Sequence, residues 1–342
     1  MLLHHAPKLL ILCTLRTGID SVVEMIRRET PISAIIGLHP DVVDPVKISG
    51  WLDIAAFAQR WGIPFHYVES YGLSSIKDKA LIESINFDLA WVCGWQRLVP
   101  AWLIQIARLG VIGGHGSPDG ITAGRGRSPQ NWAIMLGCKR FDLVLFRITE
   151  GVDDGPILLT RSIFYGDGDD IGVSYHRVSL AMAEMVAIVL SDPDKLLYGT
   201  PQSKNAFYYP QRIPEDGCVD WSLSQSIISS HCRALTRPYP GLRTYYEDNQ
   251  ITLWSCHPFD DVIDAREGQI SACFEDGEFL VNCRDGRLLI RQWEATNPSW
   301  RPKSGIMLSG KSFQEQLLTI ATRHLAKYPD RPISDRIKRF IK

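Results

Sequence analysis

Short apolar runs alternate with segments of helical periodicity through the first half of the chain. The apolar runs have the length and composition of buried strands, and they occupy residues 8–15, 33–38, 64–68, 87–95 and 109–114. Between them lie segments whose apolar residues recur at helical spacing, at residues 18–29, 53–62, 76–85 and 100–109. Strands that alternate with helices form mostly parallel sheets with helices on both faces, so the pattern predicts a Rossmann-like α/β domain.

This first domain is expected to span residues 1–192. A helix at residues 129–137 and a strand at residues 141–149 extend the alternation, and Asp170 has the side chain of a helix N-cap before a long apolar helix. Residues 193–217 are rich in proline and polar residues, which is typical of a linker rather than of a packed domain.

The remainder of the chain, residues 218–342, has a different pattern. A helical segment is followed by short apolar runs with turn residues between them, at residues 241–247, 250–256, 268–274, 278–283 and 287–293. Short strands at close spacing favour a small barrel, so we expect an OB-type, barrel-like domain. A helical pattern at residues 312–327 and a basic tail complete it.

Composition places the chain among ordinary folded proteins with two domains. Its 342 residues include 45% hydrophobic and 22% charged residues, and no window has the roughly 18 consecutive apolar residues of a membrane helix. The eight cysteines form no Cys-x-x-Cys pair, which favours the reduced thiols of a cytoplasmic protein over disulfides or a metal site. We therefore expect no membrane segment, no secretion signal and no bound metal.

Charge gives a first indication of the partners. A net charge of −1 argues against a dedicated nucleic-acid binder. Residues 301–342 nevertheless carry ten Lys/Arg and three Asp/Glu. This basic segment fits either a solvated C-terminal helix and tail or a surface for an anionic ligand or partner.

Three loops that follow predicted strands carry the candidate chemistry. They are residues 92–100, 113–120 and 149–156, and loops at the carboxyl ends of parallel strands face one cleft. His115 lies between glycines in the second loop, where its imidazole could exchange a proton with a ligand. Asp153 in the third loop would orient that imidazole and favour its charged form. Taken singly, such a histidine is more often structural, and an Asp-Asp-Gly sequence is more often a turn.

Residues 120–132 add Arg125 and Arg127 among glycines, before the start of a helix. Guanidinium groups and backbone N–H groups of this kind suit phosphate or carboxylate. The segment lacks the lysine and the spacing of a P-loop, and no Gly-x-Gly-x-x-Gly opens the first βαβ unit, which argues against the common nucleotide-binding motifs. The alternative is a flexible loop in solvent.

The order and spacing of these segments resemble the folate-dependent formyltransferase family, which includes methionyl-tRNA, glycinamide ribonucleotide and sugar N-formyltransferases. In that family a strand ends in Asn-x-His-x-Ser and an Arg-Gly-Arg-x-Pro-type loop follows, and residues 113–117 and 124–129 stand in these places. Residues 151–155 resemble the family's Gly-Val/Leu-Asp-x-Gly loop, and residues 92–100 resemble its pterin-side segment.

The second half of the chain is similar to the C-terminal domain of the methionyl-tRNA enzymes at residues 216–224 and 233–245. The resemblance therefore covers nearly the whole chain. No single motif is decisive, but their order and spacing together are specific.

This resemblance implies transfer of a formyl group from 10-formyltetrahydrofolate to a primary amine. His115 would stabilise the tetrahedral oxyanion or carry its proton, and Asp153 would orient His115 and help to accept the amine proton. The residues implied on the folate side are Trp95, Arg97, Leu98, Val99, Glu150, Gly151 and Val152. The residues implied on the acceptor side are Ser117, Arg125, Arg127 and Asn131.

One position departs from the family pattern, because Gly113 stands where the family has asparagine. A side-chain amide that would bind the developing oxyanion is absent, and one such donor typically contributes on the order of 10²–10³ in rate. Three explanations are open. Asn131 or a water molecule fills the place, backbone N–H groups of residues 113–115 hold the formyl oxygen, or the protein binds folate and nucleotide without transferring a formyl group.

We expect the acceptor to be a small amine, in particular the amino group of a nucleotide-linked sugar whose diphosphate meets Arg125 or Arg127. Methionyl-tRNA enzymes carry a loop rich in lysine and arginine after the second strand, whereas residues 38–51 hold a single lysine. Nucleic-acid affinity depends largely on phosphate neutralisation, so tRNA is disfavoured. Formylation of methionyl-tRNA and hydrolysis of 10-formyltetrahydrofolate remain alternatives, and a homodimer is compatible with the sequence.

Overall fold

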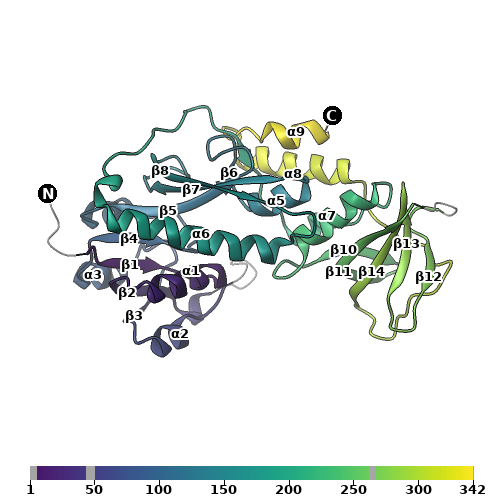
Figure 1. The fold of residues 1–342 in the computed structure, drawn as a ribbon, viewed down its shortest axis with the longest axis horizontal. Helices are drawn as coiled ribbons and strands as arrows, with labels where there is room; N and C mark the ends of the chain where they lie inside the picture. Colours follow the sequence, from purple (N-terminus) through teal and green to yellow (C-terminus); the bar gives the residue numbers. More distant parts are fainter. Residues whose placement is uncertain (1–5, 44–50, 262–265, 342) are drawn as a thin grey trace.

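The computed structural model describes residues 6–43, 51–261 and 266–341, and these residues form two larger sheets with flanking helices (Figure 1). The first sheet belongs to an α/β unit, and the second is a smaller antiparallel sheet in the C-terminal half. Both parts of the expected fold class are thereby confirmed. Residues 44–50, which hold much of the loop behind the argument against tRNA, lie outside the described residues.

The first sheet has a parallel core at the places where the apolar runs predict strands. Its five parallel strands are β1 (Leu9–Leu12), β2 (Ile32–Leu38), β3 (Phe65–Val68), β4 (Leu89–Val92) and β5 (Val111–Ser117). Two antiparallel strands, β7 (Arg140–Arg147) and β8 (Ile157–Phe164), complete the order β3-β2-β1-β4-β5-β7-β8. The sequence analysis missed β8, because polar residues interrupt its apolar ones and most of the strand is not buried.

Helices cover both faces of this sheet. They are α1 (Arg16–Arg27), α2 (Ala55–Arg60), α3 (Ile76–Ser84), α4 (Ala101–Ile106), α5 (Pro129–Met135) and α6 (Ile171–Ser191). The alternation along β1 identifies the faces, because Leu9 and Ile11 pack with α1 and α6, whereas Leu10 and Leu12 pack with α3 and α4. Mostly parallel sheets need this double cover, since both of their faces are apolar.

α6 is the longest of these helices and begins where the sequence predicts. The Asp170 carboxylate caps it by accepting a hydrogen bond from the Val173 N–H at 2.9 Å. Within the described residues, only α6 is long and apolar enough to cross a membrane by length and composition. It lies along α1 and the sheet, with 44% of its apolar window buried, so its apolar composition is that of a helix covering a core (Figure 1).

The second sheet closes on itself into the expected barrel-like form. Its strands are β10 (Leu242–Tyr246), β11 (Asn249–Asp260), β12 (Ile270–Cys273), β13 (Phe279–Cys283) and β14 (Gly286–Ala295), in the order β10-β11-β14-β13-β12. Residues 305–309 bridge the two edges, because Ser309 pairs with Tyr245 of β10 and Ile306 accepts a hydrogen bond from Ile270 of β12.

The connection between the sheets folds against the first domain. β9 (Tyr208–Tyr209) lies in the stretch expected to be a linker and pairs with β6 (Arg125–Gly126) of the Arg-Gly-Arg loop. α8 (Phe313–Lys327) and α9 (Asp335–Ile341) return from the second sheet to the side of the first domain (Figure 1). The domain division at residues 193–217 stays a prediction, but these contacts give the linker a fixed place beside the candidate site.

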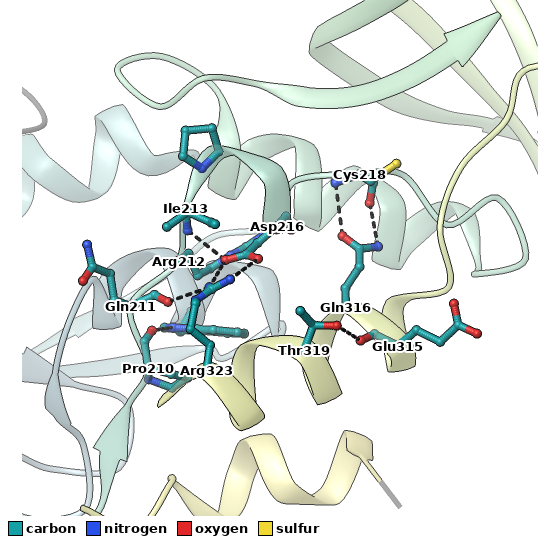
Figure 2. Close-up of polar contacts among 12 residues, drawn as sticks. Pro210, Gln211, Arg212, Ile213, Asp216, Cys218, Glu315, Gln316, Thr319 and Arg323 are labelled. Atoms are coloured by element: carbon teal, nitrogen blue, oxygen red, sulfur yellow. Dashed lines mark hydrogen bonds and ion pairs between the residues drawn. The ribbon is translucent and has the colours of Figure 1, made fainter. Parts of the chain in front are cut away.

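Polar contacts hold α8 to the linker, as Figure 2 shows. The Gln316 side chain donates a hydrogen bond to the Cys218 carbonyl at 3.1 Å and accepts one from the Cys218 N–H at 3.2 Å. Arg323 forms an ion pair with Asp216, which is buried. These bonds satisfy polar groups of Asp216, near the end of the linker, and of Cys218, directly after the linker.

α9 is held to the loop that follows β5. Arg336 forms an ion pair with Asp119, and the Tyr209 hydroxyl donates to the same carboxylate at 2.7 Å. Burial, together with the bond to Asp119, raises the pKa of Tyr209 well above its usual range. Two cations of the basic C-terminal segment, Arg323 and Arg336, are therefore neutralised by aspartates within the fold.

α7 (Gln225–Leu235) packs against α5 and buries His231 completely, with its ring 4.5 Å from the ring of Phe313. Within the part of the chain that the structure describes, the His231 Nε2 has no hydrogen-bond partner. Burial, with a smaller contribution from Arg212, lowers the pKa of His231 to about 3.

We expect His231 to make the protein lose stability in mild acid. The imidazole stays neutral in the folded chain down to about pH 3, whereas in the unfolded chain it takes a proton near pH 6.5. Its contribution to stability is therefore full above pH 6.5 and is lost as the pH falls from 6.5 toward 3, by on the order of 2–3 kcal/mol at pH 4.5. Urea unfolding of wild type and His231→Leu at pH 7.5 and 4.5 measures this, and equal losses in the two proteins would contradict it.

Candidate active site

Glycines on β5 allow His115 to stand on a closely packed strand. A Cβ on Gly114 would lie 2.1 Å from Met182 Cε, and one on Gly116 would lie 2.2 Å from Phe141 Cε1. The Phe141 ring of β7 thus leaves no room for a side chain at residue 116, and the end of the Met182 side chain of α6 fills the space above residue 114. Side chains alternate along a strand, so His115 projects from the opposite face of the sheet.

Both ring nitrogens of His115 face oxygen atoms. Nε2 lies 2.9 Å from the carbonyl oxygen of Gly124, and Nδ1 lies 3.5 Å from Oδ2 of Asp153. A carbonyl oxygen only accepts, so Nε2 carries a proton, and a proton on Nδ1 would complete an ion pair with Asp153. The two side chains are 10% and 25% exposed, so the pair is sheltered but open to solvent.

Asp153 reaches His115 by a different route from the one the sequence suggested. The alternation of strands and helices predicts a parallel strand before Asp153, with the loop that follows it at the shared carboxyl edge. β7 is antiparallel, and Arg147 near its end pairs with Ile112 at the start of β5. The β7–β8 connection must therefore fold back toward His115, with Asp153 in the left-handed region at φ 49°. A hairpin connection permits this return, whereas a crossover to a parallel strand would lead away.

The rest of this loop has the compact form of a tight turn. A Cβ on Gly151 would lie 1.9 Å from the Asp154 carboxylate, which also accepts a hydrogen bond from the Thr149 hydroxyl. Val152 is half-buried and Glu150 is exposed. The predicted donor-side residues of the loop thus lie on one folded turn next to Asp153.

The loop after β4 presents only part of the predicted folate pocket. Trp95 and Val99 are buried in the core, whereas 57% of Leu98 is exposed. The Arg97 guanidinium lies over the Tyr71 ring, 4.8 Å from its centroid. Arg97 and Leu98 are therefore available to a ligand, and Trp95 and Val99 support them from behind.

The two arginines of the Arg-Gly-Arg loop have different surroundings. Arg125 is only 6% exposed, and its Nη2 donates to the Gln202 side chain at 3.0 Å, while its Nε has no partner within the described residues. Arg127 is half-buried and donates from Nη2 to the side chain of Gln96 at 3.4 Å. Neither has an ion-pair partner among the described residues, so an anionic group would find positive charge here.

The two other predicted acceptor-side residues, Asn131 and Ser117, are buried and form hydrogen bonds within the fold, although Ser117 packs against Gly124. Asn131 is buried on α5, and its amide donates to the Ala234 carbonyl of α7. Ser117 is fully buried and accepts a hydrogen bond from the Asp119 N–H at 3.1 Å. The structure therefore does not bring Asn131 beside His115, and Ser117 holds the turn after β5.

Gly113 lies on the same face of β5 as His115, and its surroundings are filled by another side chain. A Cβ on Gly113 would lie 2.8 Å from Cδ1 of Ile148 and 3.7 Å from Cζ of Phe146. Ile148 thus takes the space where an asparagine side chain would begin. The sequence analysis did not single out Ile148, since an apolar residue at a strand end carries no chemical signal.

Gln202, which the sequence pattern does not indicate, contacts both loops around His115. Its Nε2 donates to the carbonyls of Asp153 and Gly155 at 2.9 and 2.7 Å, and its Oε1 accepts from Arg125. One glutamine in a polar, proline-rich stretch looks like any linker residue, so the sequence holds no signal for it.

Sequence comparison points to one family. Residues 212–299 match the family described as formyl transferase, C-terminal domain. The methionyl-tRNA formyltransferase of Citrifermentans bemidjiense is 29% identical over 267 residues, which make up 76% of this chain and 80% of that enzyme.

Solved structures share the fold across most of the chain. HypX from Aquifex aeolicus superposes with a TM-score of 0.59 at 16% identity, over 96% of this chain and 59% of HypX, so the chain spans only part of that longer protein. The N-formyltransferase from Helicobacter canadensis superposes with a TM-score of 0.58 at 13% identity, over 84% of this chain and 100% of that enzyme. Residues 212–299 therefore match a formyl transferase C-terminal domain, most of the chain is similar in sequence to a methionyl-tRNA formyltransferase, and the fold is that of solved formyltransferase structures.

Proposed function

We propose that this enzyme transfers the formyl group of 10-formyltetrahydrofolate to a primary amine. The observation that carries the proposal is the sheltered pair of His115 and Asp153, with Nδ1 and Oδ2 3.5 Å apart and both side chains partly open to solvent. The relatives support the choice of donor. HypX from Aquifex aeolicus has been solved with tetrahydrofolic acid, and the Helicobacter canadensis N-formyltransferase with folinic acid and dTDP-3-aminofucose.

The surface around residues 92–100 fits such a donor. An exposed apolar side chain, Leu98, lies next to Arg97, whose guanidinium stacks on Tyr71. An aromatic ring system that carries carboxylates suits an apolar side chain beside a cation. We assign Arg97 and Leu98, with the backbone of residues 150–153, to donor binding.

The proposed reaction needs a hydrogen-bond donor and a base. The amine nitrogen attacks the formyl carbon, the carbon–nitrogen bond to the folate breaks, and one proton passes from the amine to the folate nitrogen. His115 donates from Nε2 to the formyl oxygen as negative charge develops there, exchanging the Gly124 carbonyl for the substrate. Asp153 orients the imidazole and helps to accept the amine proton.

The acceptor that fits best is the amino group of a nucleotide-linked sugar. Arg125 and Arg127 lie beside the loops that contact His115, and an unpaired guanidinium suits a diphosphate. Two cations of the basic C-terminal segment are neutralised by Asp119 and Asp216, which leaves fewer for nucleic-acid phosphates. Methionyl-tRNA is the second candidate, because the curated relative at 29% identity carries that name.

Incubation with 10-formyltetrahydrofolate and each acceptor separates these alternatives. We expect tetrahydrofolate release with a dTDP-linked 3-amino sugar, accompanied by the N-formyl product, and weak binding of initiator methionyl-tRNA. Tight tRNA binding that weakens steeply with salt, together with formylation of its methionine, would replace the sugar by tRNA. Folate release with formate and without any amine would make the enzyme a hydrolase, and binding of the donor without turnover would make it a folate-binding homologue.

We also place the reaction in a reducing compartment such as the cytoplasm. All eight cysteines are unpaired thiols, and most are buried. Proteins that persist in oxidising compartments more often carry disulfides, so the thiols support this assignment.

A further inference from the structure

One side chain of the linker, that of Gln202, contacts the loops of the candidate site. Residues 200–205 are exposed except for Gln202, which is half-buried. The chain is anchored on either side of it. Thr200 and Ile157 exchange two backbone hydrogen bonds at 2.8 Å, and Phe207 accepts one from the Arg125 N–H at 3.0 Å. Gln202 therefore has little freedom to leave this position.

Both the nitrogen and the oxygen of the Gln202 side-chain amide form hydrogen bonds. Its nitrogen donates to the carbonyls of Asp153 and Gly155 at 2.9 and 2.7 Å. Its oxygen accepts from Arg125 Nη2 at 3.0 Å and from the Thr122 hydroxyl at 3.3 Å. Two donated and two accepted bonds satisfy the amide completely.

These bonds join the two loops that contact His115. Asp153 lies next to Nδ1 of His115, and Arg125 directly follows Gly124, whose carbonyl lies next to Nε2. Gln202 is thus attached to the backbone on one side of the imidazole and to the residue adjoining its partner on the other side. Asp153 needs such support, because a non-glycine residue at φ 49° is held in place by its surroundings.

We propose that Gln202 is a positioning residue, which sets the relative placement of Asp153 and the Gly124 carbonyl and thereby the orientation and protonation of His115. For its effect on catalysis the proposal rests on the proposed formyl transfer. Its effect on His115 itself does not depend on any substrate.

The test compares Gln202→Glu and Gln202→Leu in the full chain. Glutamate keeps the acceptor toward Arg125 but loses the donor and turns an anion toward two carbonyls, whereas leucine loses both ends. We expect kcat to fall about tenfold in the first variant and more in the second, with KM for 10-formyltetrahydrofolate within about twofold of wild type. Lys204→Met, an exposed neighbour on the same segment, is the matched control and should leave kcat unchanged.

A spectroscopic measurement separates positioning from general loss of structure. The ¹⁵N shifts of the His115 ring in the free protein, assigned with His115→Gln, report which nitrogen holds a proton. We expect both Gln202 variants to change these shifts and Lys204→Met to leave them as in wild type. Unchanged His115 shifts and an unchanged kcat in folded Gln202 variants would overturn the proposal, and Gln202→Glu carries the test alone if the leucine variant does not fold.

This measurement also distinguishes the two failures. A wild-type protein that forms no N-formyl product would refute the proposed function, yet the His115 shifts would still respond to Gln202. Altered shifts with unaltered kcat would show that Gln202 places His115 but that His115 does not limit the reaction, and the proposed catalytic effect would then be rejected.

Discussion

Replacing His115 by alanine is expected to lower kcat for formyl transfer by about 10³-fold, with smaller changes in KM for either substrate. The two ring nitrogens of His115 contact the Gly124 carbonyl at 2.9 Å and the Asp153 carboxylate at 3.5 Å. Alanine removes the side chain that we assign as donor to the formyl oxygen, together with its contact to Asp153. A rate loss of that size separates a catalytic histidine from one that only fills space.

The companion variant Asp153→Asn keeps the size of the side chain and removes its charge. We expect a smaller fall in kcat than for His115→Ala, because the imidazole remains and loses only the carboxylate that contacts its Nδ1. The fall in kcat of the double variant should be close to that of His115→Ala alone, because the effects of substitutions in residues that act as a unit do not add. Steady-state rates with saturating donor and acceptor measure all three.

A second His–Asp pair provides a matched control. His176 Nδ1 lies 3.6 Å from Asp20 Oδ2, almost the same separation as in the candidate site, but the His176 side chain is 74% exposed. His176→Ala should leave kcat within about twofold, because exposed pairs contribute little. A His115→Ala protein that folds normally and retains wild-type kcat would remove His115 from the chemistry and leave only a binding role.

Much of the fold follows from local patterns in the sequence. The apolar runs of β1 to β5 are buried on both faces and bounded by helical segments, so their periodicity and length identify them. β8 escapes this reasoning because it lies at the sheet edge, where much of its surface meets solvent and its apolar content is lower. The antiparallel direction of β7 also escapes it, since strand direction depends on the connection and a run of apolar residues reads the same both ways.

Some residues of the candidate site could also be predicted from the sequence, and others could not. His115 and Asp153 stand out in sequence because glycines and a familiar order of motifs surround them, and the structure brings them within 3.5 Å. Gln202 and Ile148 do not stand out, because their roles come from contacts between residues far apart in the chain. Asn131 looked suitable by residue type, but the packing of α5 on α7 turns its amide toward Ala234. Residue type predicts what a side chain can do, and only tertiary packing determines where it points.

Introducing asparagine at Gly113 together with Ile148→Ala is expected to raise kcat by about 10²-fold over Ile148→Ala alone. Gly113 and His115 share a face of β5, so an amide on residue 113 would project beside the imidazole. A Cβ there meets Ile148 at 2.8 Å from Cδ1 and 3.2 Å from Cγ1, and alanine at residue 148 removes both atoms. Gly113→Asn alone should raise kcat by less, because the asparagine side chain must first displace the side chain of Ile148.

The thermal unfolding temperatures of the three variants show whether the substitutions at residues 113 and 148 destabilise the fold. Gly113 carries no positive φ, so a side chain at that position costs no backbone strain, and it restores the strand order that glycine weakens. A faster double variant would mean that the oxyanion is under-supported in this enzyme and that Ile148 evolved in the space of the missing amide. A double variant no faster than Ile148→Ala would mean that other donors already hold the oxyanion. Backbone N–H groups of residues 113–115 would then be the candidates.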